Sequence, residues 1–271
     1  MSKPMIEACG IDKTFTLRRD GRLVEHRALK TVSADLHEGE ILGIVGESGS
    51  GKTTLSRIMI GIDTASKGEI LFHGDRVATR REWRDLRRHV QYVFQDPFTA
   101  LCPTMRIGKA LAEPLAIHGI GSREERPARV ARMLEMVGLH PDMAGRLPSQ
   151  LSGGQRQRVN LARALMSEPK VLICDEIVSG LDVSVQAQVL ALLLDLQKRL
   201  GLSLIFISHD LRVIRYLCDR VLVMYLGEIV EQGRTDEVFA APKHDYTRRL
   251  LAAIPDRDRP AHHSPIDEAL K

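Results

Sequence analysis

The chain is poor in aromatic residues and carries little excess charge. Aromatic residues make up 4% of its 271 residues, and a surface that stacks many nucleic-acid bases needs more of them. The formal net charge of +4 is also too small for a protein that coats DNA or RNA. We therefore expect no nucleic-acid partner.

The sequence also lacks paired cysteines and long apolar runs. Its four cysteines, Cys9, Cys102, Cys174 and Cys218, lie far apart, with no CxxC pair. This spacing favours neither a structural zinc site nor a disulfide scaffold, and it fits a reducing cytoplasm. The first ten residues form no apolar signal segment, and no apolar run approaches the roughly 18 residues that cross a bilayer. We expect any membrane association to be peripheral.

Short apolar runs are present within an ordinary globular composition of 44% hydrophobic and 27% charged residues. They lie at Ile41–Val45, Val171–Cys174, Leu204–Ile207 and Val221–Tyr225. Because these runs lack polar alternation, they predict strands buried on both faces of a mainly parallel sheet. Helical periodicity, clearest in Val183–Leu200, separates the later runs. The sequence therefore predicts an α/β core.

Two segments differ from this core. The first forty residues are typical of antiparallel strands, with Asp20-Gly21 as a hairpin turn between Phe15–Arg18 and Leu23–His26. The stretch 98–166 combines helical periodicity with Pro and Gly breaks, which predicts an inserted helical subdomain. We expect four parts: an antiparallel β subdomain with the first part of the core (1–97), the helical subdomain (98–166), the second part of the core (167–242) and a C-terminal extension (243–271).

A glycine-rich segment follows the first apolar run. Residues 46–53 match the G-x-x-x-x-G-K-[ST] phosphate loop, between a predicted strand and a helix that runs to about Ile60. In such a loop, backbone N–H groups surround phosphates, the lysine reaches the β and γ oxygens, and the Thr hydroxyl binds Mg²⁺. A plain Gly/Ser-rich turn is the alternative, which the complete match disfavours. The predicted nucleotide contacts are Gly46, Glu47, Ser48, Gly49, Ser50, Gly51, Lys52, Thr53 and Thr54.

Two carboxylates, Asp175 and Glu176, end the second apolar run. The carboxyl end of a parallel strand is where a residue that holds Mg²⁺ emerges in phosphate-loop enzymes. Asp175 is therefore the candidate metal ligand. Glu176 is the candidate general base that polarises the attacking water. A solvated acidic turn is the alternative, and the nearby phosphate-loop pattern makes it the weaker one.

Residues 151–155, LSGGQ, are identical to the signature of ATP-binding-cassette (ABC) ATPases and precede a predicted helix over 156–166. A serine suits the N-cap, and two glycines let the backbone approach an anion at the helix N-terminus. The chain thus resembles the nucleotide-binding subunit of an ABC transporter. The resemblance implies an ABC cassette of the phosphate-loop NTPase class, with a mixed, mainly parallel core sheet, an N-terminal antiparallel β subdomain and an inserted helical subdomain. It also implies that the ATP of a second cassette contacts Ser152, Gly153, Gly154 and Gln155.

Weaker motifs of this family occur in the same order along the chain. Gln95, Asp182 and His209 resemble the Q-loop, the D-loop and the switch histidine. The resemblance implies that Gln95 also contacts Mg²⁺ and that His209 and Lys52 stabilise developing charge. A lone histidine after a strand is commonly structural, but the accompanying motifs favour a functional one. Phe15 is the candidate for stacking on adenine, with a position in the core as an equal alternative.

The family's usual D-E-P-T-S-A-L-D is D-E-I-V-S-G-L-D here, at residues 175–182. Both carboxylates are retained, so we expect hydrolysis to be retained. The substitution of Ile177-Val178 for Pro-Thr removes a rigid backbone angle and a hydroxyl.

The late part of the chain resembles a narrower group. His244-Asp245-Tyr246-Thr247 looks like the H-P-Y-T element of the oligopeptide/dipeptide/nickel importer branch, with Asp245 in place of proline. The simpler interpretation is an amphipathic C-terminal helix. The resemblance implies an ATPase that powers an importer for peptides or a related small solute, with ATP and Mg²⁺ as cofactors.

The resemblance also implies partners and a location. The partners are a second ABC cassette, transmembrane permease subunits and, indirectly, a solute-binding protein, and the location is the cytoplasmic face of the plasma (inner) membrane. The alternative is a soluble, non-transport ABC ATPase of DNA repair or translation. Such proteins insert long coiled coils or carry two cassettes, and neither feature is visible in the sequence.

Overall fold

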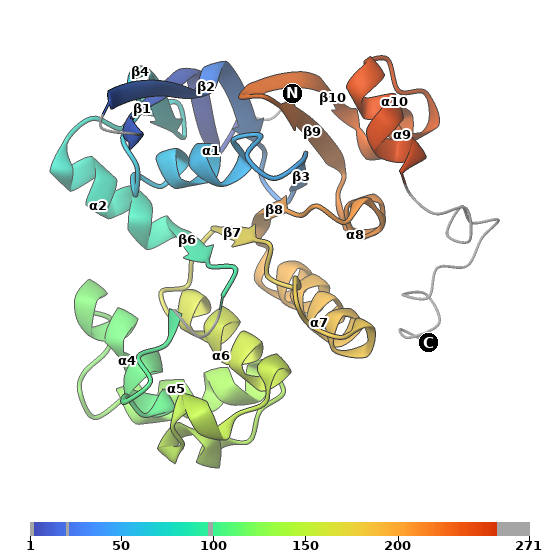
Figure 1. The fold of residues 1–271 in the computed structure, drawn as a ribbon. Coiled ribbons are helices and arrows are strands. Elements are labelled where there is room, and N and C mark those ends of the chain that lie inside the picture. Colours follow the sequence, from blue (N-terminus) through green and yellow to red (C-terminus); the bar gives the residue numbers. More distant parts are fainter. Residues whose placement is uncertain (1–2, 20–21, 97–99, 254–271) are drawn as a thin grey trace. The chain divides into compact units, whose positions relative to one another are not determined.

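The computed structural model describes residues 3–19, 22–96 and 100–253, and it forms two compact units (Figure 1). Within the described residues, unit 1 joins residues 3–87 to 203–253, and unit 2 spans residues 88–202. The predicted hairpin turn at Asp20-Gly21 lies outside the described residues.

Unit 1 contains an antiparallel sheet with the strand order β2-β1-β4-β5. Its strands are β1 (Ile6–Arg19), β2 (Arg22–Leu36), β4 (Lys67–Phe72) and β5 (Asp75–Arg76). The long β1–β2 pair places Phe15 opposite His26. The antiparallel character predicted for the first forty residues is confirmed.

Unit 1 also contains the first predicted core strand. β3 (Ile41–Val45) pairs in parallel with β8 (Ser203–Ile207) and β9 (Arg220–Tyr225), and β9 pairs antiparallel with β10 (Glu228–Arg234). Every residue of β3 and β8 is buried, as their unbroken apolar sequences predict. Among the described residues, the helices that lie wholly within unit 1 are α1 (Lys52–Met59), α8 (Leu211–Leu217), α9 (Thr235–Ala240) and α10 (Asp245–Ala252).

Unit 2 pairs β6 (Val90–Val93) in parallel with β7 (Val171–Asp175). The chain reaches β6 through α2 (Arg80–His89). Three helices, green to yellow-green in Figure 1, gather beside one another: α4 (Ile107–His118), α5 (Arg126–Met136) and α6 (Gly153–Leu165). Short 3-10 turns at Pro141–Gly145 and Pro148–Gln150 connect α5 to α6.

The longest helix of unit 2, α7 (Val183–Leu200), has the bounds that its periodicity predicts. Asp182 caps its N-terminus, and Gly201 ends it in the left-handed conformation with φ of 62°. Val189, Leu193 and Leu196 are fully buried along one face. Among the helices of the described residues, we find none with the length and apolarity that spanning a bilayer requires.

A partly buried arginine connects the two sheets of unit 1. Arg220, at the start of β9, donates from Nε to Oε1 of Glu40 at 2.8 Å and from Nη2 to Oδ2 of Asp35 at 3.0 Å. Its side chain is 22% exposed and that of Glu40 is 12% exposed. Burial alone would lower the pKa of Arg220, but the two carboxylates raise it above its ordinary value. The cluster therefore ties β9 to the end of β2.

Arg220→Ala should lower the free energy of unfolding by about 2 kcal/mol, because it leaves a partly buried carboxylate without its charged donor. Urea denaturation measures this loss. The matched control is Arg234→Ala, which removes an exposed ion pair to Asp236 and should change stability little. Equal losses in the two variants would contradict a stabilising role for the Arg220 cluster.

Candidate functional site

The glycine-rich loop of residues 46–51 joins β3 to α1 in unit 1. Gly46 has a φ of 148°, and a Cβ built on it would lie 2.2 Å from the Met224 carbonyl oxygen of β9. Only glycine fits at such a distance from another backbone. The loop therefore begins packed directly against a core strand, which fixes its path.

Lys52 turns back over this loop. Its Nζ donates to the carbonyl oxygens of Gly46 at 2.7 Å and Glu47 at 2.9 Å, and the residue is only 5% exposed. Within the described residues, the buried hydroxyl of Ser50 has no hydrogen-bond partner. The first turn of α1 contains no acidic side chain that would repel an anion. An ammonium, a free hydroxyl and a helix N-terminus together suit phosphate oxygens.

The two strand-end carboxylates lie in unit 2, and each has a defined partner. Asp175 is 3% exposed, and the Tyr92 hydroxyl of β6 donates to its Oδ2 at 2.7 Å. Glu176 has a φ of 48°, a strained value for a residue with a side chain. The Gln95 Nε2 donates to Glu176 Oε2 at 3.0 Å. The structure thus brings together Gln95 and Glu176, which the sequence suggested separately.

Sequence reasoning missed Tyr92. The residue follows Gln91 in β6, and the centre of its ring lies 4.8 Å from the centre of the Phe94 ring. A tyrosine in a buried strand usually directs its hydroxyl to a polar partner. The sequence could therefore have indicated that Tyr92 needs a polar partner. It could not have identified Asp175 as that partner, because the two residues are 83 positions apart in the chain.

The signature residues begin α6 in unit 2 with a capping box. The Ser152 hydroxyl accepts from the Gln155 amide at 3.3 Å, and the Gln155 side chain accepts from the Ser152 amide at 3.0 Å. A Cβ on Gly154 would lie 2.7 Å from a methyl group of Val185 on α7. The N-cap predicted at Ser152 is therefore confirmed, and the start of α6 packs closely on the start of α7.

The segment after Glu176 packs inward and then caps α7. Ile177 and Val178, which replace the family's Pro-Thr, are 1% and 4% exposed. The Asp182 carboxylate accepts from the Val185 amide at 2.9 Å and from the Ser184 hydroxyl at 2.7 Å. These two donors lower the pKa of Asp182 below its ordinary value. The substituted residues therefore add apolar packing within unit 2.

The remaining predicted site residues belong to unit 1. Thr53 and Thr54 lie in the first turn of α1. His209 is exposed and follows β8, just before the N-cap of α8. Phe15 is half-buried on β1, and the Lys13 ammonium lies 4.7 Å from the centre of its ring. The structure places these residues in the unit that carries the phosphate loop, and their roles remain predictions.

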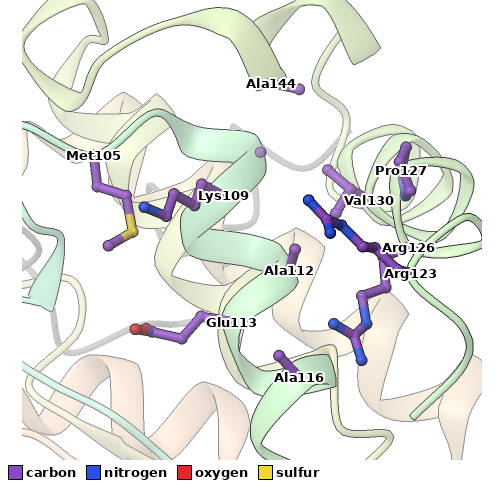
Figure 2. A pocket seen from close by; sticks show the side chains of 11 residues that line it. Met105, Lys109, Ala112, Glu113, Ala116, Arg123, Arg126, Pro127, Val130 and Ala144 are labelled. Carbon is purple, nitrogen blue, oxygen red and sulfur yellow. The ribbon is translucent and has the colours of Figure 1, made fainter. Parts of the chain in front are cut away.

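A second feature of unit 2 is a cavity of about 580 Å³ between α4 and α5 (Figure 2). In Figure 2, Ala112 lies on the side of α4 that faces Arg126 and Val130, whereas the Lys109 side chain extends toward the other side of the helix. The Nε atom of Arg126 is buried and has no hydrogen-bond partner among the described residues. The lining is formed by Met105, Gly108, Lys109, Ala112, Glu113, Ala116, Arg123, Arg126, Pro127, Val130 and Ala144.

Comparison with known families gives two matches. The ABC transporter family matches residues 29–179, and the oligopeptide/dipeptide transporter C-terminal region matches residues 230–269. A putative peptide import ATP-binding protein of Brucella ovis is 49% identical over 257 residues, which cover 94% of this chain and 80% of that protein. The glutathione import ATP-binding protein GsiA of Salmonella typhimurium is 47% identical over 268 residues, 97% of this chain and 43% of the relative.

Solved structures agree with this assignment. A dimeric ATP-binding cassette in a post-hydrolysis state, bound to ADP and Pi, has a TM-score of 0.75 at 30% identity, and the match covers 85% of this chain and 99% of the cassette. CbiO1 from Clostridium perfringens, part of the ABC transporter complex CbiONQ, has a TM-score of 0.76 at 30% identity, with coverage of 94% and 97%. The predicted α/β cassette fold is confirmed. The chain belongs to the ABC transporter family as an ATP-hydrolysing cassette.

Proposed function

We propose that the chain hydrolyses ATP to power the import of peptides or a related small solute. The observation that carries this proposal is the phosphate loop with Lys52 turned over it, in a chain that also carries the strand-end pair Asp175 and Glu176. The match of residues 230–269 to oligopeptide/dipeptide transporters and the peptide import relatives support the cargo class. They also favour an importer over a non-transport ABC ATPase.

The phosphate loop binds the triphosphate in this proposal. Lys52 exchanges its two loop carbonyls for β- and γ-phosphate oxygens, and the free hydroxyl of Ser50 supplies a further donor. Backbone N–H groups of the loop and the N-terminus of α1 add positive potential. Phe15 supplies the aromatic face for adenine.

Thr53, Gln95 and Asp175 are the proposed ligands of Mg²⁺. They offer a hydroxyl, an amide and a carboxylate, and Mg²⁺ prefers oxygen ligands of this kind. The Tyr92 hydroxyl orients the Asp175 carboxylate. A bound Mg²⁺ neutralises charge that develops on the β- and γ-phosphates.

Glu176 is the proposed general base. The Gln95 Nε2 donates to one carboxylate oxygen of Glu176 at 3.0 Å and orients the carboxylate. The carboxylate then accepts a proton from the attacking water. His209 and Lys52 stabilise the negative charge that develops on the transferred phosphoryl group.

Glu176→Gln should lower the rate of ATP hydrolysis by about 10²–10⁴, because the amide cannot accept the proton. Binding of ATP, measured by calorimetry, should remain within a few-fold of wild type. The matched control is Glu135→Gln, which changes an exposed carboxylate on α5 and should retain wild-type turnover. Wild-type turnover in Glu176→Gln would remove Glu176 from this role.

The proposed active form is a head-to-tail pair of cassettes, each ATP lying between one phosphate loop and the partner's signature residues. The N-terminus of α6 is suitable for an anion, because Ser152 forms a capping box there and the first turn of the helix contains no acidic residue. Hydrolysis removes the γ-phosphate that bridges the two cassettes, so the pair reopens.

A mixture of two inactive variants tests this arrangement. Lys52→Ala chains and Ser152→Arg chains, each inactive alone, should recover part of the wild-type turnover when mixed, because each mixed dimer contains one complete site. A chain that carries both substitutions, mixed with either single variant, is the control and should recover nothing. No recovery from two folded, dimerising single variants would contradict assembly of the site across the dimer.

The cavity between α4 and α5 is the proposed docking site for a helix of the permease subunit (Figure 2). Lys109, Arg123 and Arg126 contribute positive charge to its lining, whereas the Glu113 carboxylate is paired with Arg163 at 2.8 Å. The apolar wall suits a helix, and the cations favour one that carries an acidic side chain. In this proposal the docked chain is peripheral to the cytoplasmic face of the inner membrane. A solute-binding protein is an indirect partner, which acts on the chain through the permease.

Cysteine crosslinking tests the docking site. Ala112→Cys should crosslink to a co-expressed permease, and ATP should change the yield. The native Cys102 is first replaced by serine, because it is exposed and its Thr104 contact lowers the pKa of its thiol. Lys198→Cys, at the far end of α7, is the control. Crosslinks formed by Lys198→Cys alone would contradict this location.

A further inference from the structure

A tyrosine of the C-terminal extension contacts the phosphate loop. The Tyr246 hydroxyl, on α10, accepts a hydrogen bond from the Glu47 amide N–H at 2.9 Å. Tyr246 is 2% exposed, so this contact is shielded from water. We propose that Tyr246 is a positioning residue of the nucleotide site, which holds the Gly46–Glu47 peptide in the orientation that ATP binding requires. This inference rests on the proposed role of the phosphate loop.

A single peptide unit connects Tyr246 to Lys52. The carbonyl of Gly46 accepts from Lys52 Nζ at 2.7 Å, and the N–H of the same peptide donates to Tyr246. Rotation of this peptide would break both hydrogen bonds together. Tyr246 therefore fixes the carbonyl that holds the Lys52 ammonium, and it keeps that peptide in place when Lys52 turns toward phosphate.

The ring of Tyr246 is itself held by the end of β9. It stacks on Tyr225 with a centroid distance of 4.2 Å and an interplanar angle of 28°. The preceding residue of β9, Met224, is the one whose carbonyl leaves no space for a Cβ at Gly46. One strand end therefore supports both the start of the phosphate loop and the aromatic ring that contacts it.

The chain before Tyr246 is also fixed. The Glu231 carboxylate of β10 accepts from the amides of Lys243 at 2.8 Å and His244 at 3.0 Å. Burial alone would raise the pKa of Glu231, but these donors hold it below its ordinary value. The His244 ring nitrogen Nδ1 accepts from the Tyr246 amide at 3.1 Å and caps α10. These hydrogen bonds hold the segment 243–246 in place, so the Tyr246 hydroxyl has a defined position beside the loop.

The Tyr246 hydroxyl accepts the Glu47 hydrogen bond as a neutral phenol. Burial raises the pKa of the Tyr246 phenol above its ordinary value, so it stays protonated at neutral pH. A phenylalanine at this position would retain the stacked ring but would leave the Glu47 N–H without its partner. The expected effect therefore falls on nucleotide affinity rather than on the folding of α10.

Tyr246→Phe should raise the Kd and the KM for ATP by about two- to tenfold, the range that corresponds to loss of one hydrogen bond. The kcat should stay within about twofold of wild type. The unfolding midpoint without nucleotide should fall, because the buried Glu47 N–H loses its acceptor, so ATP affinity is compared under conditions where both variants are fully folded. The matched control is Tyr225→Phe, which removes a hydroxyl from the other ring of the stack and should leave the Kd unchanged. Wild-type Kd in Tyr246→Phe, or an equal Kd increase in Tyr225→Phe, would overturn the inference.

Lys52→Ala, measured in the same binding assay, separates this inference from the proposed function. Loss of ATP binding in Lys52→Ala with wild-type binding in Tyr246→Phe would overturn only the role of Tyr246. Wild-type binding in Lys52→Ala would overturn the role of the phosphate loop, and the inference would fail with it. Weakened binding in both variants, with Tyr225→Phe unchanged, supports both.

Discussion

The close approach of the phosphate loop to the end of β9 is the constraint on which the nucleotide site depends. Gly46 lies so near the Met224 carbonyl that no side chain fits, and this contact sets where the loop begins. At the end of the loop, the Lys52 ammonium donates to the carbonyl oxygens of Gly46 and Glu47. The turn after β9 adds a second support, because the Gly227 amide donates to the Ser50 carbonyl at 3.0 Å. The loop is thereby shaped for an anion by backbone packing.

The two units contribute different chemistry to the proposed reaction. Unit 1 supplies positive charge and backbone donors for phosphate, whereas unit 2 supplies the carboxylates and the signature helix. In unit 2 each carboxylate is oriented by a neutral hydrogen-bond donor: Tyr92 for Asp175 and Gln95 for Glu176.

The C-terminal region shared with oligopeptide/dipeptide transporters has a physical connection to the nucleotide site in this chain. Its Tyr246 ring stacks on β9, and its hydroxyl lies on the loop. Asp245, which stands where the branch has proline, begins α10 and pairs with Arg248, so the substitution is compatible with the helix. In the proposed function, this segment therefore supports the loop that binds phosphate.

Local sequence determined the elements and the motifs of this protein. Unbroken apolar runs identified β3 and β8, a regular period identified α7, and short motifs located Lys52, Asp175 and the Ser152 cap, because each pattern depends on residues close together in the chain. Tertiary structure alone decided which distant groups meet. The Tyr246–Glu47 contact spans 199 residues and the Tyr92–Asp175 contact spans 83. No periodicity encodes such pairs, since they arise when distant strands and helices pack together within each unit.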